Sequence, residues 1–374
     1  MRSKVGLVGK VIAYKLFRKY GRPKIMPINI TFSVTNKCNS RCKTCLLWQF
    51  YRKHPKLKGK EFKTFEFEKT FRSLGKSIFW LTLSGGEPFL RDDLPEICET
   101  ACKYCEPAII NIPTNCLLGK KIEKLTKEIL KKSSNKTEFI INLSLDGIQK
   151  KHDEIRGIPG NFEKVMEVYK RLQNLKKEYS NLKIGIHTVV SVFNIDEILN
   201  IYEYVKKNLN PDSYITEIAE ERVELSTVGK KITPDVEKYR NVITQLIKRI
   251  NEDYMDKEGI SKITQKFRTL YYQMVPEILM EKKQIIPCYA GFASCQIDPF
   301  GNIWPCCILA STKSFGNLRD VNFDFKKIWK GKKTEVFRNF VRNKQCFCPM
   351  ANASYTNILC DFNSIFKIIM KECD

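Results

Sequence analysis

The sequence is short of acidic residues and has no N-terminal apolar run long enough to span a membrane. Of 374 residues, 65 are Lys or Arg and 41 are Asp or Glu, which gives a formal net charge of +24. Lys10 and Lys15 interrupt the first apolar stretch, so neither a cleavable signal peptide nor a membrane-spanning helix is expected there. Hydrophobic residues make up 43% of the chain, which is enough for a core and excludes global disorder.

The 15 cysteines are clustered along the chain. A secreted protein held by disulfides would be much shorter and would begin with a signal peptide. We therefore expect a soluble, cytoplasmic protein of a reducing compartment, in which the clustered thiols are metal ligands.

Apolar, β-branched runs alternate with amphipathic stretches over the first 220 or so residues. The expected strands are 28–35, 78–84, 108–114, 139–145, 184–191 and 213–218. The expected helices are 94–104, 122–132, 162–177 and 195–208. Six such units predict an α/β fold, in which a parallel sheet covered by helices curves into a partial (β/α)6 TIM-like barrel. Ligands of such folds bind at the carboxyl ends of the strands.

The rest of the chain differs in composition from this repeating part. Residues 1–24 carry eight basic and no acidic residues, and we expect them to form an amphipathic segment before a barrel over 25–222. A helical connector over 223–286 is predicted from periodic stretches at 234–252 and 262–281. Residues 287–374 are rich in cysteine and are expected to form a small, loop-rich domain.

Three cysteines, Cys38, Cys42 and Cys45, follow the first expected strand with the spacing C-x3-C-x2-C. Thiolates so close together suit an iron–sulfur cluster or zinc, and a redox-active pair is a further alternative. No fourth cysteine is near, and His54 lies nine residues after Cys45, so nothing completes a tetrahedral zinc site. Three ligands would leave one metal position open for a substrate or cofactor.

The second expected strand ends in the residues LSGGEP. Gly85 and Gly86 allow close backbone approach, and Glu87 with Pro88 fixes a loop whose polar groups can meet an ammonium group. An ordinary turn at the end of a strand is the simpler interpretation when this motif is taken alone.

The cysteine loop and the LSGGEP motif together resemble the radical SAM superfamily over roughly residues 25–220. The resemblance implies that Cys38, Cys42 and Cys45 hold a catalytic 4Fe-4S cluster whose open iron binds S-adenosylmethionine, with Gly85, Gly86, Glu87 and Pro88 also binding the cofactor. It implies an oxygen-sensitive enzyme that reductively cleaves S-adenosylmethionine to a 5'-deoxyadenosyl radical and abstracts hydrogen from a substrate C–H bond. A low-potential donor of the ferredoxin or flavodoxin type would supply the electron. Thr44 departs from the pattern, because an aromatic residue is frequent before the third cysteine.

By the same resemblance, Asn115, Ser144 and Arg156 bind the cofactor near the ends of the third and fourth strands. Arg156 is suited to pairing with the cofactor carboxylate, although a local salt bridge is the alternative. His152 could simply begin a helix. His187 is equally compatible with a packed core position and with an active-site role.

The second group of cysteines surrounds a predicted hairpin turn over 298–301. Its pattern, C-x12-G-x4-C and then a later pair, resembles the SPASM or shorter twitch extension of radical SAM enzymes. The resemblance implies one auxiliary 4Fe-4S cluster, held by Cys288, Cys295 and Cys306 with Cys346 or Cys348; a zinc ribbon is the alternative. Cys98, Cys102, Cys105 and Cys116 are assigned to packing, and Cys307, Cys360 and Cys373 have no assigned role.

The substrate is not written in any motif. A peptide or protein is suggested by the auxiliary domain, and a lipid or membrane-linked glycan by the basic N-terminus. An RNA-modifying enzyme and a zinc-binding scaffold without catalysis are the alternatives, although nucleic acid is disfavoured because no RNA-binding motif accompanies the charge. Val5, Val8, Ile12 and Leu16 form a helical stripe, widened by Leu7, Val11 and Tyr14. This helix either lies on an anionic membrane surface, which we favour slightly, or packs on the bottom of the barrel.

Overall fold

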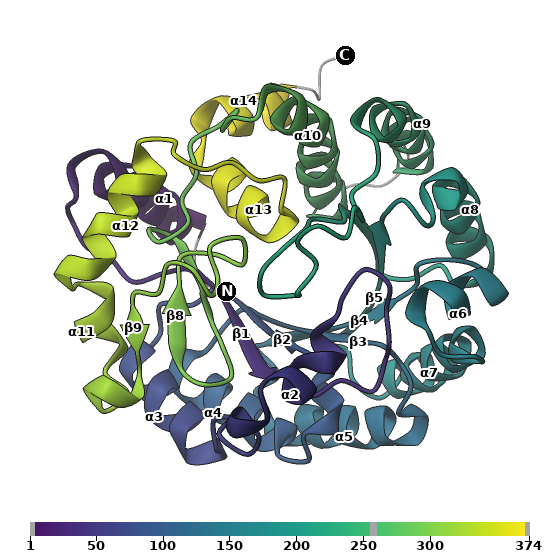
Figure 1. The fold of residues 1–374 in the computed structure, drawn as a ribbon, viewed down its shortest axis with the longest axis horizontal. Coiled ribbons are helices and arrows are strands. Elements are labelled where there is room, and N and C mark those ends of the chain that lie inside the picture. The colour runs from purple at the N-terminus through teal and green to yellow at the C-terminus, as the bar shows by residue number, and fades with distance from the viewer. Residues whose placement is uncertain (1–3, 255–259, 371–374) are drawn as a thin grey trace.

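The structure is a computed structural model that describes residues 4–254 and 260–370. Six parallel strands lie in the order β6-β5-β4-β3-β2-β1, each hydrogen-bonded to the next in sequence. They are β1 (Asn29–Thr35), β2 (Trp80–Gly85), β3 (Ile109–Thr114), β4 (Glu138–Ser144), β5 (Leu182–Val190) and β6 (Ser213–Ile218). All six predicted strands are present, and the predicted partial α/β barrel is confirmed (Figure 1).

Helices cover the outer face of this curved sheet (Figure 1). They are α3 (Thr64–Leu74), α4 (Leu94–Cys105), α5 (Gly119–Lys132), α6 (Lys150–Arg156), α7 (Asn161–Lys176) and α8 (Ile198–Asn208). Two longer helices follow the barrel, as the periodicity predicts: α9 (Val236–Tyr254) and α10 (Ile260–Glu281). No helix in the described part of the chain is long and apolar enough to cross a membrane.

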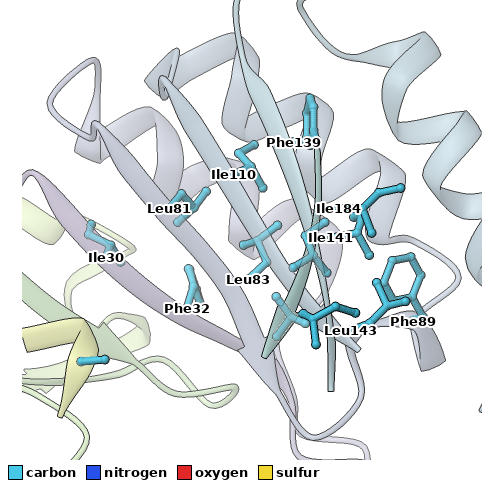
Figure 2. Packing of buried hydrophobic residues seen from close by; sticks show 14 of the residues in the cluster. Ile30, Phe32, Leu81, Leu83, Phe89, Ile110, Phe139, Ile141, Leu143 and Ile184 are labelled. Carbon is cyan, nitrogen blue, oxygen red and sulfur yellow. The ribbon is translucent and has the colours of Figure 1, made fainter. Parts of the chain in front are cut away.

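The two faces of the barrel sheet differ in polarity. Side chains such as Leu83, Ile110 and Ile141 are buried between the strands and the outer helices, and Figure 2 shows this packing. Because successive side chains point to opposite faces of a strand, the intervening residues line the inner face. Several of these inner residues are polar and partly exposed: Thr31, Thr82, Asn111, Ser144 and His187.

The C-terminal region continues the barrel sheet. The strand β7 (Ser294–Ile297) pairs in parallel with β1, and β8 (Asn302–Trp304) and β9 (Gly316–Asn317) add to it in antiparallel fashion. The predicted hairpin turn is confirmed: Asp298 Oδ1 accepts from the backbone N–H of Phe300 and of Asn302, both at 2.9 Å. Gly301 at its end has φ +90°, which favours glycine.

The expectation of a loop-rich tail is wrong, because four helices lie in it: α11 (Phe325–Trp329), α12 (Lys332–Arg342), α13 (Ala351–Cys360) and α14 (Phe362–Met370). The helix α13 lies inside the ring, beside α10 (Figure 1). It contacts both edges of the barrel, since Glu217 of β6 accepts from the N–H of Ala351 at 3.0 Å and Asn29 of β1 donates to Thr356 at 2.9 Å. Its small polar residues lack the apolar periodicity by which amphipathic helices are predicted.

The N-terminal helix α1 (Lys4–Tyr20) packs against the C-terminal region. Tyr14 and Phe17 are buried in a cluster with Phe292, and Arg18 Nε donates to the carbonyl oxygen of Cys288 at 2.9 Å. The packed alternative for this helix therefore holds, although its main partner is the C-terminal region and not the bottom of the barrel. The opposite face remains uncovered at Ile12 and Leu16. The side chains of Val5, Leu7 and Val8 lie outside the described part.

Replacing Phe17 with alanine should lower the free energy of unfolding by about 3–5 kcal/mol, because it leaves a cavity in this cluster. Phe17 is fully buried, meets Phe292 edge-on with ring centroids 5.3 Å apart, and lies under the guanidinium of Arg338. The neighbouring Leu16→Ala should change stability by no more than about 0.5 kcal/mol, because Leu16 is exposed. Denaturant unfolding measures both variants, and equal effects would contradict the packing of α1.

Candidate functional site

The cysteine loop after β1 is held in place by the end of helix α6. The backbone N–H of Arg41 donates to the carbonyl of Arg156 at 3.0 Å, and that of Lys43 to the carbonyl of Ile155 at 2.8 Å. Gly157 ends α6 with φ +68°, and a Cβ there would lie 2.5 Å from the carbonyl oxygen of Arg41. The last carbonyls of a helix have no partner within it, and here they fix the loop that carries the thiols.

The three thiols of this loop lie close enough to act on one another. Burial is the largest of the causes that raise the pKa of Cys38 to about 11 and that of Cys45 to about 12, and repulsion from Cys42 contributes to both shifts. Burial disfavours the charge on Arg156, but the neighbouring Cys42 and Asp146 outweigh it and raise the pKa of the guanidinium. Buried or half-buried thiols that repel one another as thiolates fit a positively charged metal centre, which binds only the deprotonated form.

The GGEP loop after β2 lies directly against the cysteine loop. The N–H of Gly86 donates to the carbonyl of Thr35 at 2.7 Å, and that of Glu87 to the carbonyl of Lys37 at 2.8 Å. A Cβ on Gly85 would lie 2.1 Å from the Thr35 oxygen, and one on Gly86 would lie 2.1 Å from the Lys37 oxygen. Both glycines are needed because the two backbones touch.

Gly86→Ala should therefore displace the cysteine loop and lower its ability to hold iron. A misplacement of about 1 Å at a reacting centre costs roughly a hundredfold in rate, and we expect a loss of that order in S-adenosylmethionine cleavage. Gly9→Ala is the matched control, because no atom lies within 4 Å of a Cβ at Gly9. Iron content and cleavage rate are measured together; retention of both by the Gly86 variant would contradict this close contact.

Glu87 is buried, and its hydrogen bonds connect the GGEP loop to the end of the neighbouring strand. Its carboxylate accepts hydrogen bonds from Asn115 N–H at 2.7 Å, Thr114 Oγ1 at 3.0 Å and Phe89 N–H at 3.1 Å. Burial raises its pKa to about 7. Glu87 thus joins the ends of β2 and β3, while the next residue, Pro88, begins a short 3-10 helix (Pro88–Leu90) and is buried. The carboxylate of Glu87 is therefore engaged in hydrogen bonds within the protein.

A buried polar network links the ends of β3 and β4. Asn115 donates to Asn39 Oδ1 of the cysteine loop at 2.8 Å, and the carbonyl of Asn115 accepts from Asn161 Nδ2 at 2.9 Å. His152 lies inside α6, where Nδ1 accepts from the N–H of Asp146 at 3.1 Å and Nε2 lies 3.2 Å from Asn161 Oδ1. Burial lowers the pKa of His152 to about 4, so the imidazole is neutral. Asn161 was not predicted, because no local pattern in the sequence distinguishes it.

Arg156 forms the local salt bridge that was the alternative for it. Its Nη1 lies 3.0 Å from Asp146 Oδ2. Its Nε is buried and has no hydrogen-bond partner in the described part of the chain. Ser144 lies partly exposed at the end of β4, on the inner face. A buried guanidinium N–H without a partner fits an anionic group of a bound ligand, such as the carboxylate of S-adenosylmethionine.

Four cysteines of the C-terminal region line one largely apolar cavity: Cys288, Cys306, Cys346 and Cys348. Burial raises the pKa of Cys346 to about 11, and burial followed by repulsion from neighbouring thiols raises the pKa values of Cys306 and Cys348. Gln284 fixes two of the segments, since its amide donates to the carbonyl of Cys346 at 3.0 Å and accepts from the N–H of Cys288. Four thiols around one apolar space fit a cluster whose irons are all bound by cysteine.

Cys295, which the sequence also suggests as a ligand, does not line this cavity. It lies on β7 in the main hydrophobic core, and its charged neighbour is Arg338. Alternation along β7 explains this: Gln296 faces the interior and hydrogen-bonds Glu224, so Cys295 faces the other way. Cys307 contacts Arg222 instead of the cavity. The hydrophobic core contains Cys98, Cys102, Cys105 and Cys116, in agreement with their assignment to packing. Cys373 lies outside the described residues.

Two family models match the parts of the chain that contain these cysteines. The model of the radical SAM superfamily matches residues 32–205, and the SPASM model, an iron–sulfur cluster-binding domain, matches residues 288–349. The chain belongs to the radical SAM superfamily, and it is an enzyme of the subgroup that carries a C-terminal SPASM domain. The first domain implies a 4Fe-4S cluster and S-adenosylmethionine, and the second implies auxiliary iron–sulfur binding. A scaffold protein without catalysis is thereby set aside.

Several characterised proteins resemble the chain. The antilisterial bacteriocin subtilosin biosynthesis protein AlbA of Bacillus subtilis is 26% identical over 87% of this chain and 66% of its own length. The mycofactocin maturase MftC of Mycolicibacterium smegmatis is 24% identical over 87% and 75%. A GTP 3',8-cyclase of Clostridium perfringens is 33% identical, but over 51% of this chain and 54% of the cyclase. The solved structure of anSMEcpe with bound AdoMet shares the fold, with a TM-score of 0.57, 15% identity and coverage of 92% and 97%.

Proposed function

We propose that this radical SAM enzyme modifies a peptide. The similarity to AlbA and MftC extends over both the barrel and the SPASM region, whereas the similarity to the GTP cyclase covers about half of the chain. AlbA takes part in the biosynthesis of a bacteriocin, an antibacterial peptide, and MftC is a maturase. Relatives of similar coverage include an AdoMet-dependent haem synthase of Oleidesulfovibrio alaskensis, so a tetrapyrrole is the competing substrate class.

The polarity of the inner sheet face is the observation that carries this proposal. Thr31, Thr82, Asn111 and Ser144 offer hydroxyl and amide groups that are partly exposed on that face. His187 lies on the same face, and its Nε2 is 3.7 Å from Glu217 Oε2, so it is not a packed core imidazole. Hydroxyls and amides can pair with the N–H and C=O groups of a peptide backbone, whereas a flat tetrapyrrole is recognised chiefly by apolar side chains.

Within this proposal each part of the site has a role. Cys38, Cys42 and Cys45 hold the catalytic 4Fe-4S cluster, and Arg156 presents its free N–H to the carboxylate of S-adenosylmethionine. When bound, the cluster and S-adenosylmethionine supply the one-electron chemistry that breaks an unactivated C–H bond. Asn115 and the end of α6 fix the cysteine loop, and Glu87 shapes the GGEP loop beside it. Cys288, Cys306, Cys346 and Cys348 hold the auxiliary cluster.

The experiment compares substrate classes on one preparation. Anaerobically reconstituted enzyme is incubated with S-adenosylmethionine, dithionite and one of four probes: a pooled random peptide library, iron coproporphyrin, total tRNA or undecaprenyl-linked glycan. We expect the peptide pool to raise 5'-deoxyadenosine formation several-fold and to contain products of altered mass. Stimulation by another probe, with no altered peptide, would overturn the proposal.

A further inference from the structure

Two neighbouring helices carry apolar side chains on their outer faces. Ile12 and Leu16 of α1 are 46% and 43% exposed, although the opposite side of α1 is buried. Phe362, Phe366 and Met370 of α14 are 49%, 62% and 49% exposed. A spacing of four places each set along one face of its helix. Lys15 of α1 joins the two helices, because its Nζ lies 3.5 Å from the ring centroid of Phe362.

A basic hollow borders the apolar face of α1. It lies between α1, the end of α3 and α11, and Gly9 and Ala13 of α1 form part of its wall. Residues three apart are neighbours on a helix surface, so Gly9 adjoins Ile12 and Ala13 adjoins Leu16. Five lysines line the hollow and no acidic residue does: Lys10, Lys24, Lys76, Lys326 and Lys330.

The charge of this surface is compensated only in part. The helix α1 contains five basic residues and no acidic residue. Lys24 and Lys76 pair with Glu335 and Glu106, which lie outside the hollow, and Lys10 donates to the carbonyl of Ser77. Lys326 and Lys330 form no ion pair within the described residues. A ligand that fits here combines anionic groups with an apolar layer.

We propose that α1, α14 and the lysine hollow, together called the α1–α14 face, dock on an anionic phospholipid bilayer. The lysines of the hollow bind headgroup phosphates, and Ile12, Leu16 and the α14 phenyl rings enter the interface between headgroups and acyl chains. Interfacial helices combine an apolar face with flanking Lys and Arg in this way. A bilayer supplies both anion and hydrocarbon over one continuous surface, which a free phosphate cannot do. The buried side of α1 keeps the helix attached to the protein.

The test is co-sedimentation of the full chain with vesicles. Vesicles of phosphatidylcholine and phosphatidylglycerol in equal parts are compared with pure phosphatidylcholine, each at low and high salt. We expect binding to the anionic vesicles alone, lost at high salt because exposed charges are screened. Failure to bind anionic vesicles at low salt would overturn the proposal.

Two pairs of variants separate the contributions. Lys326→Gln with Lys330→Gln should weaken binding to anionic vesicles roughly tenfold or more, because each lysine near the surface contributes measurably to affinity. The matched control, Lys131→Gln with Lys170→Gln, removes the same charge from the exposed sides of α5 and α7 and should leave binding unchanged. An equal loss in both pairs would show a non-specific charge effect and overturn the proposal.

Two further measurements test the apolar side chains of α1 and the alternative of a soluble phosphate ligand. Ile12→Ser with Leu16→Ser should also weaken vesicle binding, while the melting temperature stays close to that of the wild type because both side chains are exposed. Inorganic phosphate or pyrophosphate that raises the melting temperature, without any vesicle binding, would identify a soluble phosphate site and overturn the lipid assignment. None of these measurements depends on the peptide substrate, so the two proposals succeed or fail separately.

Discussion

Replacing Cys42 with alanine should abolish the formation of 5'-deoxyadenosine from S-adenosylmethionine and remove about four of about eight irons, the content of one four-iron cluster. Cys42 is the central thiol of its loop, it is buried, and its sulfur lies 3.1 Å from Ser40 Oγ. Without it two thiols remain, and two cannot hold a cluster in place. Iron analysis and chromatography of the reaction products measure both effects on anaerobically reconstituted protein.

The matched control is Cys98→Ala, which removes a fully buried thiol from α4. It should keep the wild-type iron content and rate, because Cys98 lies in the core behind the sheet and not in the cysteine loop. A Cys42 variant that still forms 5'-deoxyadenosine at the wild-type rate would show that the catalytic cluster is assigned to the wrong residues.

The double replacement of Cys288 and Cys306 with alanine should remove the other half of the iron and leave the first cluster intact. Both thiols line the cavity shared with Cys346 and Cys348, and the loss of two of four ligands leaves the auxiliary cluster unsupported. The remaining protein should still bind S-adenosylmethionine and cleave it at a measurable rate. Iron and sulfide analysis, together with absorption spectra of the protein, follow the loss.

Cys295→Ala separates the structural assignment from the sequence-based one. Because Cys295 packs in the core and does not line the cavity, this variant should retain all its iron and lose roughly 1 kcal/mol of stability. Loss of half the iron in Cys295→Ala would restore Cys295 as a ligand. Zinc in place of iron in the wild-type C-terminal region would reject the auxiliary cluster altogether.

Most of the barrel could be predicted because its sequence signals are local. Strands such as β3 and β5 are apolar runs with β-branched residues, and the helices between them repeat apolar residues with a helical period. The cysteine loop and the GGEP loop follow strands β1 and β2, whose carboxyl ends lie side by side in a parallel pair. The order of the strands is therefore enough to predict that these two motifs, which are far apart in the sequence, lie side by side in the fold.

The features that were missed depend on contacts between distant segments. The hairpin pairs β7 with β8, but alternation within β7 places Cys295 in the core, whereas Cys306 lines the cavity. The helix α13 was not predicted, because it has no apolar stripe: Thr356 accepts from Asn29 of β1, and the backbone N–H of Ala351 donates to Glu217 of β6. His152 and Asn161 join the ends of β3 and β4 through hydrogen bonds that no spacing in the sequence indicates.

The N-terminal helix shows how two interpretations of one pattern can both apply. Its apolar residues divide between a buried side, with Tyr14 and Phe17, and an exposed side, with Ile12 and Leu16. From the sequence alone, packing and surface binding are alternatives, because the pattern does not show that the helix is apolar on both sides. Packing is confirmed by the structure, and the exposed side motivates the bilayer proposal.

The most direct test of the whole account is electron paramagnetic resonance of the dithionite-reduced protein, with and without S-adenosylmethionine. We expect signals from two reduced clusters, of which one changes on addition of S-adenosylmethionine, because its fourth iron is not bound by cysteine. The variant lacking Cys42 should show the other signal alone, unaffected by S-adenosylmethionine. A spectrum with no S-adenosylmethionine-dependent change in the wild type would contradict the assignment of Cys38, Cys42 and Cys45 as the catalytic cluster site.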